Sequence, residues 1–192
     1  MERTGQAEVF LTASEFDQAK RTYTLLITEF PTYPNLHFAF GCLLLETHDP
    51  DAAVQQFQLE LERDPDHVNS MLQIAVALQL IDPRGGLRYA ERAAQLSPKL
   101  PFAHYILGML RLETGNPAGA IPELEIAQKA FPTEAGVYFS LGKAYARVGR
   151  KADAASARAE FTRLNALAAK EKQGPTIYGE EKRSLDKEKP IS

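Results

Sequence analysis

The chain has 192 residues, a formal net charge of −3, an apolar fraction of 44% and a charged fraction of 24%. These values describe an ordinary soluble protein of one domain's length or slightly more, and its acidic balance argues against a nucleic-acid partner. No run approaches the roughly 20 apolar residues of a membrane span. The single cysteine, Cys42, excludes an internal disulfide.

A helical pattern recurs about every 34 residues, and three series of landmark residues keep its register. Small residues recur at Ala7, Gly41, Ala75, Gly108 and Gly142, and again at Ala19, Ala53, Gly86, Ala120 and Ala154, while prolines close units at Pro31, Pro65, Pro98 and Pro132. The series share one missing residue between Ala75 and Gly86, which places a deletion in the turn of the third unit. Such units stack into a solenoid because none can bury its apolar face alone.

In chain order, the pattern predicts five units of two helices each and a tail. The units are 1–33, 34–67, 68–100, 101–134 and 135–172, and the tail is 173–192. The first unit is degenerate and looks incomplete, since Gln6 stands where leucine is expected. Asp49-Pro50, Asp82-Pro83 and Asn116-Pro117 separate the two helices of the middle units. Asp or Asn suits a helix N-cap and Pro suits the position after it.

The fourth and fifth units extend this prediction to the C-terminus. Pro122 lies too deep in its helix for a free first-turn position, so we expect a kink or a delayed helix start. The last helix should run on to about Lys172, and the polar tail is predicted to be disordered. Phe161, Leu164 and Leu167 form an apolar stripe that no sixth unit covers. Either Ile177 and Tyr178 fold back onto this stripe, which we favour, or a second chain covers it.

The repeat resembles the tetratricopeptide repeat family over roughly residues 1–168. The matching residues are Leu107-Gly108, Ala120, Ala127 and Pro132 in the fourth unit, and Tyr138, Leu141-Gly142, Tyr145, Gly149 and Ala154 in the fifth. The resemblance implies an all-α fold, a right-handed α-solenoid of about five stacked antiparallel helix pairs. The chain departs from the family in having no Trp, whose usual position holds Arg3, His37, Met71, His104 and Tyr138. Glu60, Arg158 and Phe161 also replace the residue types expected in second helices.

The resemblance further implies a protein or peptide partner, bound in a concave groove that the first helix of each unit lines. Carried over in register, the predicted groove residues are Phe38, Cys42, Leu45, Asn69, Leu72, Gln73, Val76, Phe102, Tyr105, Met109, Leu112, Phe139, Lys143 and Arg147. Together they describe an apolar, aromatic trough with polar ends, which suits an amphipathic helix or an extended segment. The competing interpretation is that several of these side chains only pack against a neighbouring helix.

Catalytic, cofactor and metal signals are missing from the sequence. The four histidines lie in different units without ligand spacing, and His37 and His104 share one repeat position, which favours packing roles. Gly85-Gly86 follows no predicted strand, so it is not a phosphate-binding loop. Cys42 has no paired His or base and is expected to be a buried, inert thiol. We therefore predict a non-enzymatic interaction scaffold without cofactor or metal.

Two alternatives concern what surrounds this segment and what it binds. The chain is alternatively the repeat segment of a larger enzyme or envelope assembly protein. It would then be periplasmic if a leader precedes Met1, whereas cytoplasmic is the default in the absence of a signal peptide.

Residues 1–67 carry a net charge of −8 and residues 68–168 a net charge of +4. Solvated faces explain this asymmetry most simply, but it also permits head-to-tail self-association, with the Phe161, Leu164 and Leu167 stripe as one contact.

Overall fold

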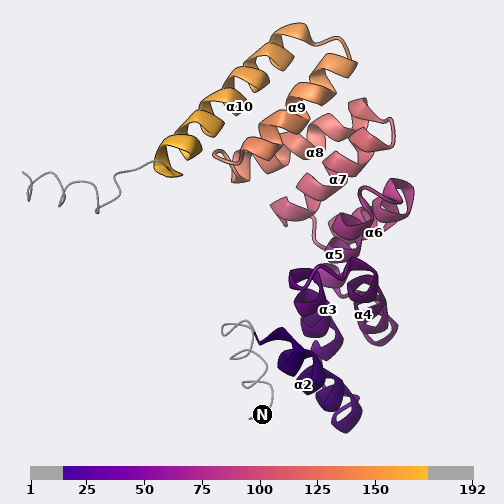
Figure 1. The fold of residues 1–192 in the computed structure, drawn as a ribbon. Coiled ribbons are helices and arrows are strands. Elements are labelled where there is room, and N and C mark those ends of the chain that lie inside the picture. Colours follow the sequence, from indigo (N-terminus) through magenta and orange to yellow (C-terminus); the bar gives the residue numbers. More distant parts are fainter. Residues whose placement is uncertain (1–14, 173–192) are drawn as a thin grey trace, which may run out of the picture.

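The computed structural model describes residues 15–172, and these residues form nine α-helices and no strand (Figure 1). In chain order they are α2 (Phe16–Glu29), α3 (Leu36–Glu46), α4 (Pro50–Arg63), α5 (Val68–Leu78), α6 (Pro83–Leu96), α7 (Pro101–Glu113), α8 (Pro117–Ala130), α9 (Ala135–Arg147) and α10 (Lys151–Lys172). The predicted all-α helical repeat is confirmed. The first helix of the first unit and the tail lie outside the described residues.

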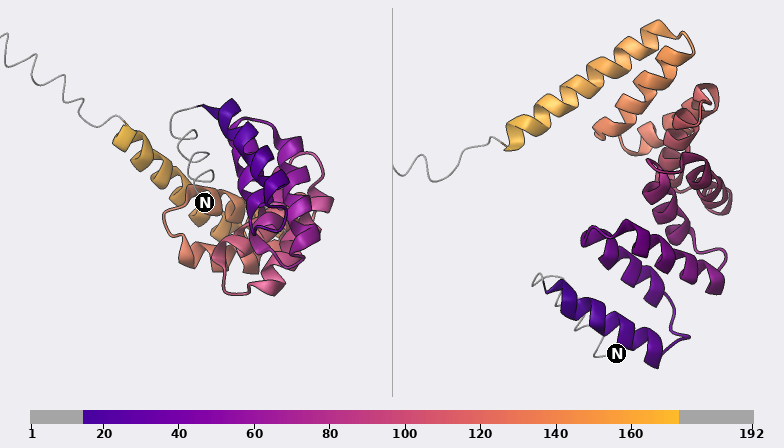
Figure 2. Two further views of the ribbon diagram at one scale, coloured as in Figure 1. Left: turned by 90° about the horizontal axis from the view of Figure 1, so that it is seen from below. Right: turned by 45° about the vertical axis from the view of Figure 1, so that its right-hand side comes forward.

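The helices form antiparallel pairs that stack on one another in a curved row (Figures 1 and 2). The pairs are α3 with α4, α5 with α6, α7 with α8 and α9 with α10, while α2 packs against α3. Successive first helices also touch, α5 with α7 and α7 with α9. In a curved stack the closest elements lie on the inner side, so the first helices line the inner face. No described helix is long and apolar enough to cross a membrane.

Capping residues set where the second helices begin, as the sequence predicts. Asp49, Asp82 and Asn116 each accept a hydrogen bond from the backbone N–H three residues later, at distances of 2.9 to 3.2 Å. A proline follows each cap at the first helical position. The delayed start considered for Pro122 does not occur, because α8 begins at Pro117 and continues through Pro122. The Pro122 side chain is exposed, so its ring meets solvent instead of the core.

Small residues bring the two helices of a pair close together. A Cβ added to Gly108 would lie 2.7 Å from Leu124 Cγ and 3.3 Å from the Ala120 carbonyl oxygen. A Cβ on Gly41 would lie 2.5 Å from the Phe57 ring. The lack of a side chain at Gly108 thus lets α7 approach α8 closely at Ala120 and Leu124. The pairs pack so tightly there that a single methyl group does not fit without movement.

The predicted deletion falls in the turn between α5 and α6, where it removes a left-handed residue. The other described turns between paired helices contain such a residue, namely His48, Gly115 and Gly149 with φ of 58°, 88° and 81°. There the residue after it donates its N–H to a carbonyl five positions back, as in Asp49 to Leu44, Asn116 to Arg111 and Arg150 to Tyr145. In the third unit Asp82 instead bonds to Leu78, four positions back. This shorter turn leaves Leu80 91% exposed.

Candidate functional site

One row of the predicted groove residues lies at the junctions between units. It holds Phe38, Leu72, Tyr105 and Phe139, one from each first helix. The Phe38 ring meets the ring of His67, the N-cap residue of α5, with centroids 5.1 Å apart. The Tyr105 hydroxyl lies where a Cβ on Gly136 of the next unit would be 2.6 Å away. Leu72 is only 3% exposed, so this row mainly joins one unit to the next.

Phe139, the last residue of that row, is more exposed than the other three. Phe139 remains 49% exposed although its counterparts in the earlier units are buried or half-buried. It contacts Phe161 of α10, with ring centroids 5.3 Å apart, and the Lys143 ammonium lies 5.5 Å from its ring centroid. Phe139 is exposed because no described helix follows α10 to cover it.

A second row of predicted residues runs along the inner face and stays open to solvent. It consists of Cys42 on α3, Val76 on α5 and Met109 on α7, and it ends at Lys143 on α9. Val76 is 38% exposed, and Cys42 and Met109 are partly exposed. Lys143 donates to Glu113 at 2.8 Å across the α7–α9 contact. We call Cys42, Val76 and Met109 the inner apolar row.

The remaining predicted groove residues divide between surface and core. Phe102 is 40% exposed at the start of α7, Asn69 is exposed, and Leu45 and Gln73 are partly exposed. Leu112 is only 1% exposed and belongs to the core shared by the last two pairs. Arg147 donates to the Leu112 carbonyl at 2.6 Å and so ties α9 to α7. Leu72 and Leu112 therefore present almost no surface to a partner.

Burial also determines the chemistry of the inner face. The pKa of the Cys42 thiol is raised, mainly by burial and to a smaller extent by the nearby negative charge of Glu46. Burial and the Glu134 charge likewise raise the pKa of Tyr105. Both groups thus hold their protons near neutral pH, and the face offers contact surface instead of a reactive nucleophile. Within the described residues, no three His, Cys, Asp or Glu side chains gather in a way that would hold a metal ion.

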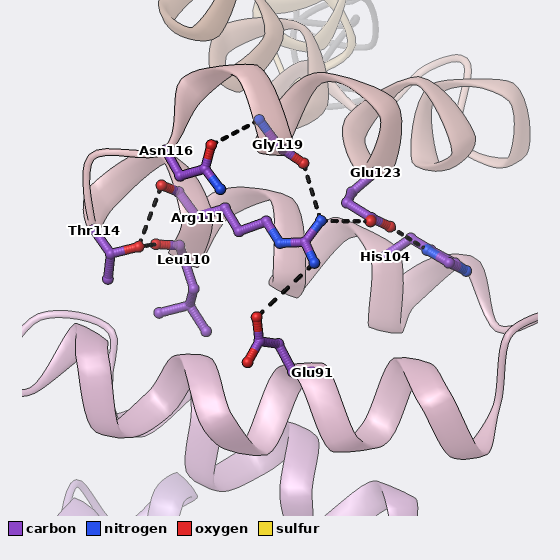
Figure 3. Close-up of polar contacts among 8 residues, drawn as sticks. All are labelled: Glu91, His104, Leu110, Arg111, Thr114, Asn116, Gly119 and Glu123. Carbon is purple, nitrogen blue, oxygen red and sulfur yellow. Dashed lines mark hydrogen bonds and ion pairs between the residues drawn. The ribbon is translucent and has the colours of Figure 1, made fainter.

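A polar network connects α6, α7 and α8, and so joins the third and fourth units (Figure 3). Arg111 donates to Glu123 at 2.7 Å and to the Gly119 carbonyl at 3.1 Å, and it lies 3.9 Å from Glu91 on α6. Glu123 also bonds to His104 Nδ1 at 2.6 Å. Sequence reasoning missed this network because its members are far apart in the chain and carry no motif. The available signals were His104 and Arg111, two polar residues within the mainly apolar sequence of α7.

His104 is fixed at both ring nitrogens, which agrees with the packing role expected for it. Nε2 lies 2.9 Å from the Pro98 carbonyl, and Tyr138 Oη donates to the Pro132 carbonyl at the equivalent place in the next unit. Burial lowers the pKa of His104, but the hydrogen bonds to Glu123 and Pro98 outweigh it and leave this pKa raised. In the fourth and fifth units, the residues that replace the usual Trp thus anchor α7 and α9 to the proline of the preceding unit.

Glu60 has a structural role that the sequence pattern did not reveal. It is 3% exposed, and its two carboxylate oxygens accept from the backbone N–H groups of Asn35 and Phe38, each at 3.2 Å. Asn35 makes no side-chain cap of its own. The carboxylate of α4 therefore caps the start of α3, where backbone donors lack helical partners.

Comparisons with known proteins agree with this architecture. A family model described as tetratricopeptide repeat matches residues 76–135 and 105–169. Two relatives come from Schizosaccharomyces pombe. Anaphase-promoting complex subunit 3 is 26% identical over 140 residues, which cover 71% of this chain and 21% of that protein. Superkiller protein 3 is 28% identical over 145 residues, which cover 71% of this chain and 10% of that protein. The chain thus spans a small part of either relative.

Several solved structures have the same fold. A crystal structure of MamA superposes with a TM-score of 0.75 at 21% identity, covering 85% of this chain and 96% of that chain. A second MamA structure, from Desulfovibrio magneticus RS-1, gives 0.73 at 21% identity, with coverage of 88% and 94%. YrrB, described as a TPR protein with an unusual peptide-binding site, gives 0.71 at 18% identity, with coverage of 86% and 88%. At these identities the likeness shows the fold alone.

Proposed function

Because this chain belongs to the tetratricopeptide repeat family, we propose that it is a non-enzymatic scaffold that binds a peptide or helix of a partner protein along its inner face. The observation that carries the proposal is the inner apolar row. Three consecutive first helices present an apolar side chain at the same repeat position, and each side chain keeps solvent-accessible surface. The accessible parts of these side chains repeat from helix to helix as an apolar strip, although Cys42 and Met109 also pack against the core.

The chemistry of the strip defines what it should bind. Cys42, Val76 and Met109 offer apolar contact, and Met109 adapts to ligands of different shape because its side chain is unbranched. Exposed Phe102 and Asn69 flank the strip and add an aromatic surface and an amide. A segment with apolar side chains on one face, extended or helical, fits such a strip.

The test uses peptides selected against the purified protein from a random display library. The variant Val76→Glu, Met109→Glu places two carboxylates on the strip, and the control Ile126→Glu places one on the outer helix α8, where Ile126 is 41% exposed. We expect the double variant to lose at least tenfold in affinity and the control to bind like the wild type. Loss of about 1.4 kcal/mol of binding free energy corresponds to that factor.

Circular dichroism of all three proteins shows whether the fold survives. Selected peptides that bind the folded double variant as tightly as the wild type would place the binding surface elsewhere. Equal loss in the double variant and the α8 control would show that added negative charge, and not the strip, weakens binding.

A further inference from the structure

The last helix pair ends in an open face that the earlier pairs bury. Phe161 occupies the repeat position of Ala127, Ala93 and Glu60, which are at most 3% exposed. Arg158 occupies the position of Leu124, Ala90 and Phe57, which are fully buried. In those pairs the buried apolar residues at the two positions belong to core clusters that include residues of the next first helix, whereas Glu60 caps α3 of its own pair. At α10 the same positions line a surface.

This surface contains a cleft of about 310 Å³ between α9 and α10. Its lining residues are Phe139, Gly142, Lys143, Arg158, Phe161 and Thr162. The lining is mainly apolar, with the half-exposed ring of Phe139 and the partly exposed ring of Phe161, and it includes two cations. Lys143 is paired with Glu113, whereas Arg158 has no ion pair among the residues that the structure describes. A ligand for this cleft would therefore combine an apolar or aromatic side chain with a carboxylate.

The chain itself carries that combination shortly after α10, in residues outside the described part. Ile177 and Tyr178 are followed by Glu180 and Glu181. Gln173-Gly174-Pro175 precedes them and is a typical helix stop, because glycine permits the left-handed reversal and proline cannot continue a helix. Along the chain, a helix-ending turn is thus followed by an apolar pair of residues and then by an acidic pair.

The number of residues after α10 is also sufficient to reach back to the cleft. Phe161 lies 11 residues before Lys172, or about 16 Å along the helix. Tyr178 follows Lys172 by six residues, which span at most about 20 Å when fully extended, and the reversal at Gly174-Pro175 takes up part of that length. The exposed side chains along this path, Asn165, Ala168 and Ala169, are small and leave room for a returning strand. Continued in the same direction, Glu180 and Glu181 come level with Arg158.

We propose that residues 173–181 fold back along α10, place Ile177 and Tyr178 in the cleft between Phe139 and Phe161, and pair Glu180 and Glu181 with Arg158. The segment takes the place of the sixth first helix and closes the C-terminal end of the solenoid. It is independent of the proposed partner site, whose strip lies on α3, α5 and α7.

The experiment uses the full chain with Tyr178→Trp. The chain has no tryptophan, so the introduced indole is the sole fluorophore of its kind. We expect emission at shorter wavelength than that of free indole and reduced quenching by acrylamide, unchanged on dilution. Ile191→Trp, placed farther along the tail, is the matched control and should emit as a solvated indole.

Charge reversal tests the contacts without disturbing the core, because Arg158 is exposed. Adding Arg158→Glu to Tyr178→Trp should shift emission to longer wavelength, and adding Glu180→Lys with Glu181→Lys should reverse that shift. Phe139→Ala should also expose the indole, with circular dichroism confirming the fold. A solvated indole in the Tyr178→Trp protein, or a shielded one insensitive to both Arg158→Glu and Phe139→Ala, would overturn the proposal. Shielding that disappears on dilution would assign the cleft to a second copy instead.

Discussion

Glu60 shows how one buried carboxylate replaces a small residue of the repeat. Its oxygens accept from Asn35 and Phe38 across the α3–α4 pair, so its charge lies at the positive end of α3. The sequence indicated only that an acidic residue interrupts the expected pattern. Its role depends on two backbone donors more than twenty positions earlier, and no local pattern reveals them.

We expect Glu60→Gln to destabilise the protein although the side chain keeps its shape. Glutamine offers one acceptor oxygen, and its NH₂ group would face a backbone donor. Leaving that buried N–H without an acceptor costs about 1–3 kcal/mol of unfolding free energy. Glu62→Gln, exposed on the same helix, should change it by less than about 0.5 kcal/mol. Urea denaturation followed by circular dichroism measures both, and equal stability of the two variants would show that the cap contributes nothing.

At the scale of the helix, the sequence predicted most of what the structure contains. The caps Asp49, Asp82 and Asn116 act over three residues, so short patterns reveal them. The inner face was less predictable. Repeat register identifies equivalent positions, but Leu72 is buried where Phe38 is half-exposed, because the neighbouring unit and not the register determines what covers them. The site could therefore be predicted as a face, whereas its accessible residues could not.

Equivalent glycines should respond in opposite ways to the same substitution. Gly108→Ala forces a Cβ against buried Leu124, and overpacking of this kind costs about 1–3 kcal/mol. A Cβ on Gly142 would meet nothing closer than Arg158 Cγ at 3.4 Å, so Gly142→Ala should stabilise by roughly 0.5–1 kcal/mol through its better helix propensity. Thermal denaturation of the two variants checks the sign of each change. If both substitutions raised or both lowered the stability, the distance between the paired helices would not explain the effect of these glycines.

For the whole molecule, linear stacking means that stability depends on position in the row. Each unit of a solenoid contacts only its neighbours, so its stability comes from its own fold and from the adjoining junctions. Helix α7 contacts α5, α6, α8 and α9, whereas the main helix contact of α2 among the described helices is with α3. The side chains of residues 165–170 on α10 are all exposed. The middle of the row is thus supported from both sides and the described ends from one.

Native-state hydrogen exchange should reveal this gradient. We expect the slowest amides in α7 and α8, faster exchange in α2, and the fastest helical amides in the last turns of α10, because local opening is easiest where few contacts are lost. Gly108→Ala weakens the central pair, so it should accelerate exchange in α7 and α8 first and reduce the difference between the middle and the ends. Peptide-level mass spectrometry resolves each helix. Uniform protection from α2 to α9, changed equally everywhere by Gly108→Ala, would instead mean that the described helices open as a single cooperative unit.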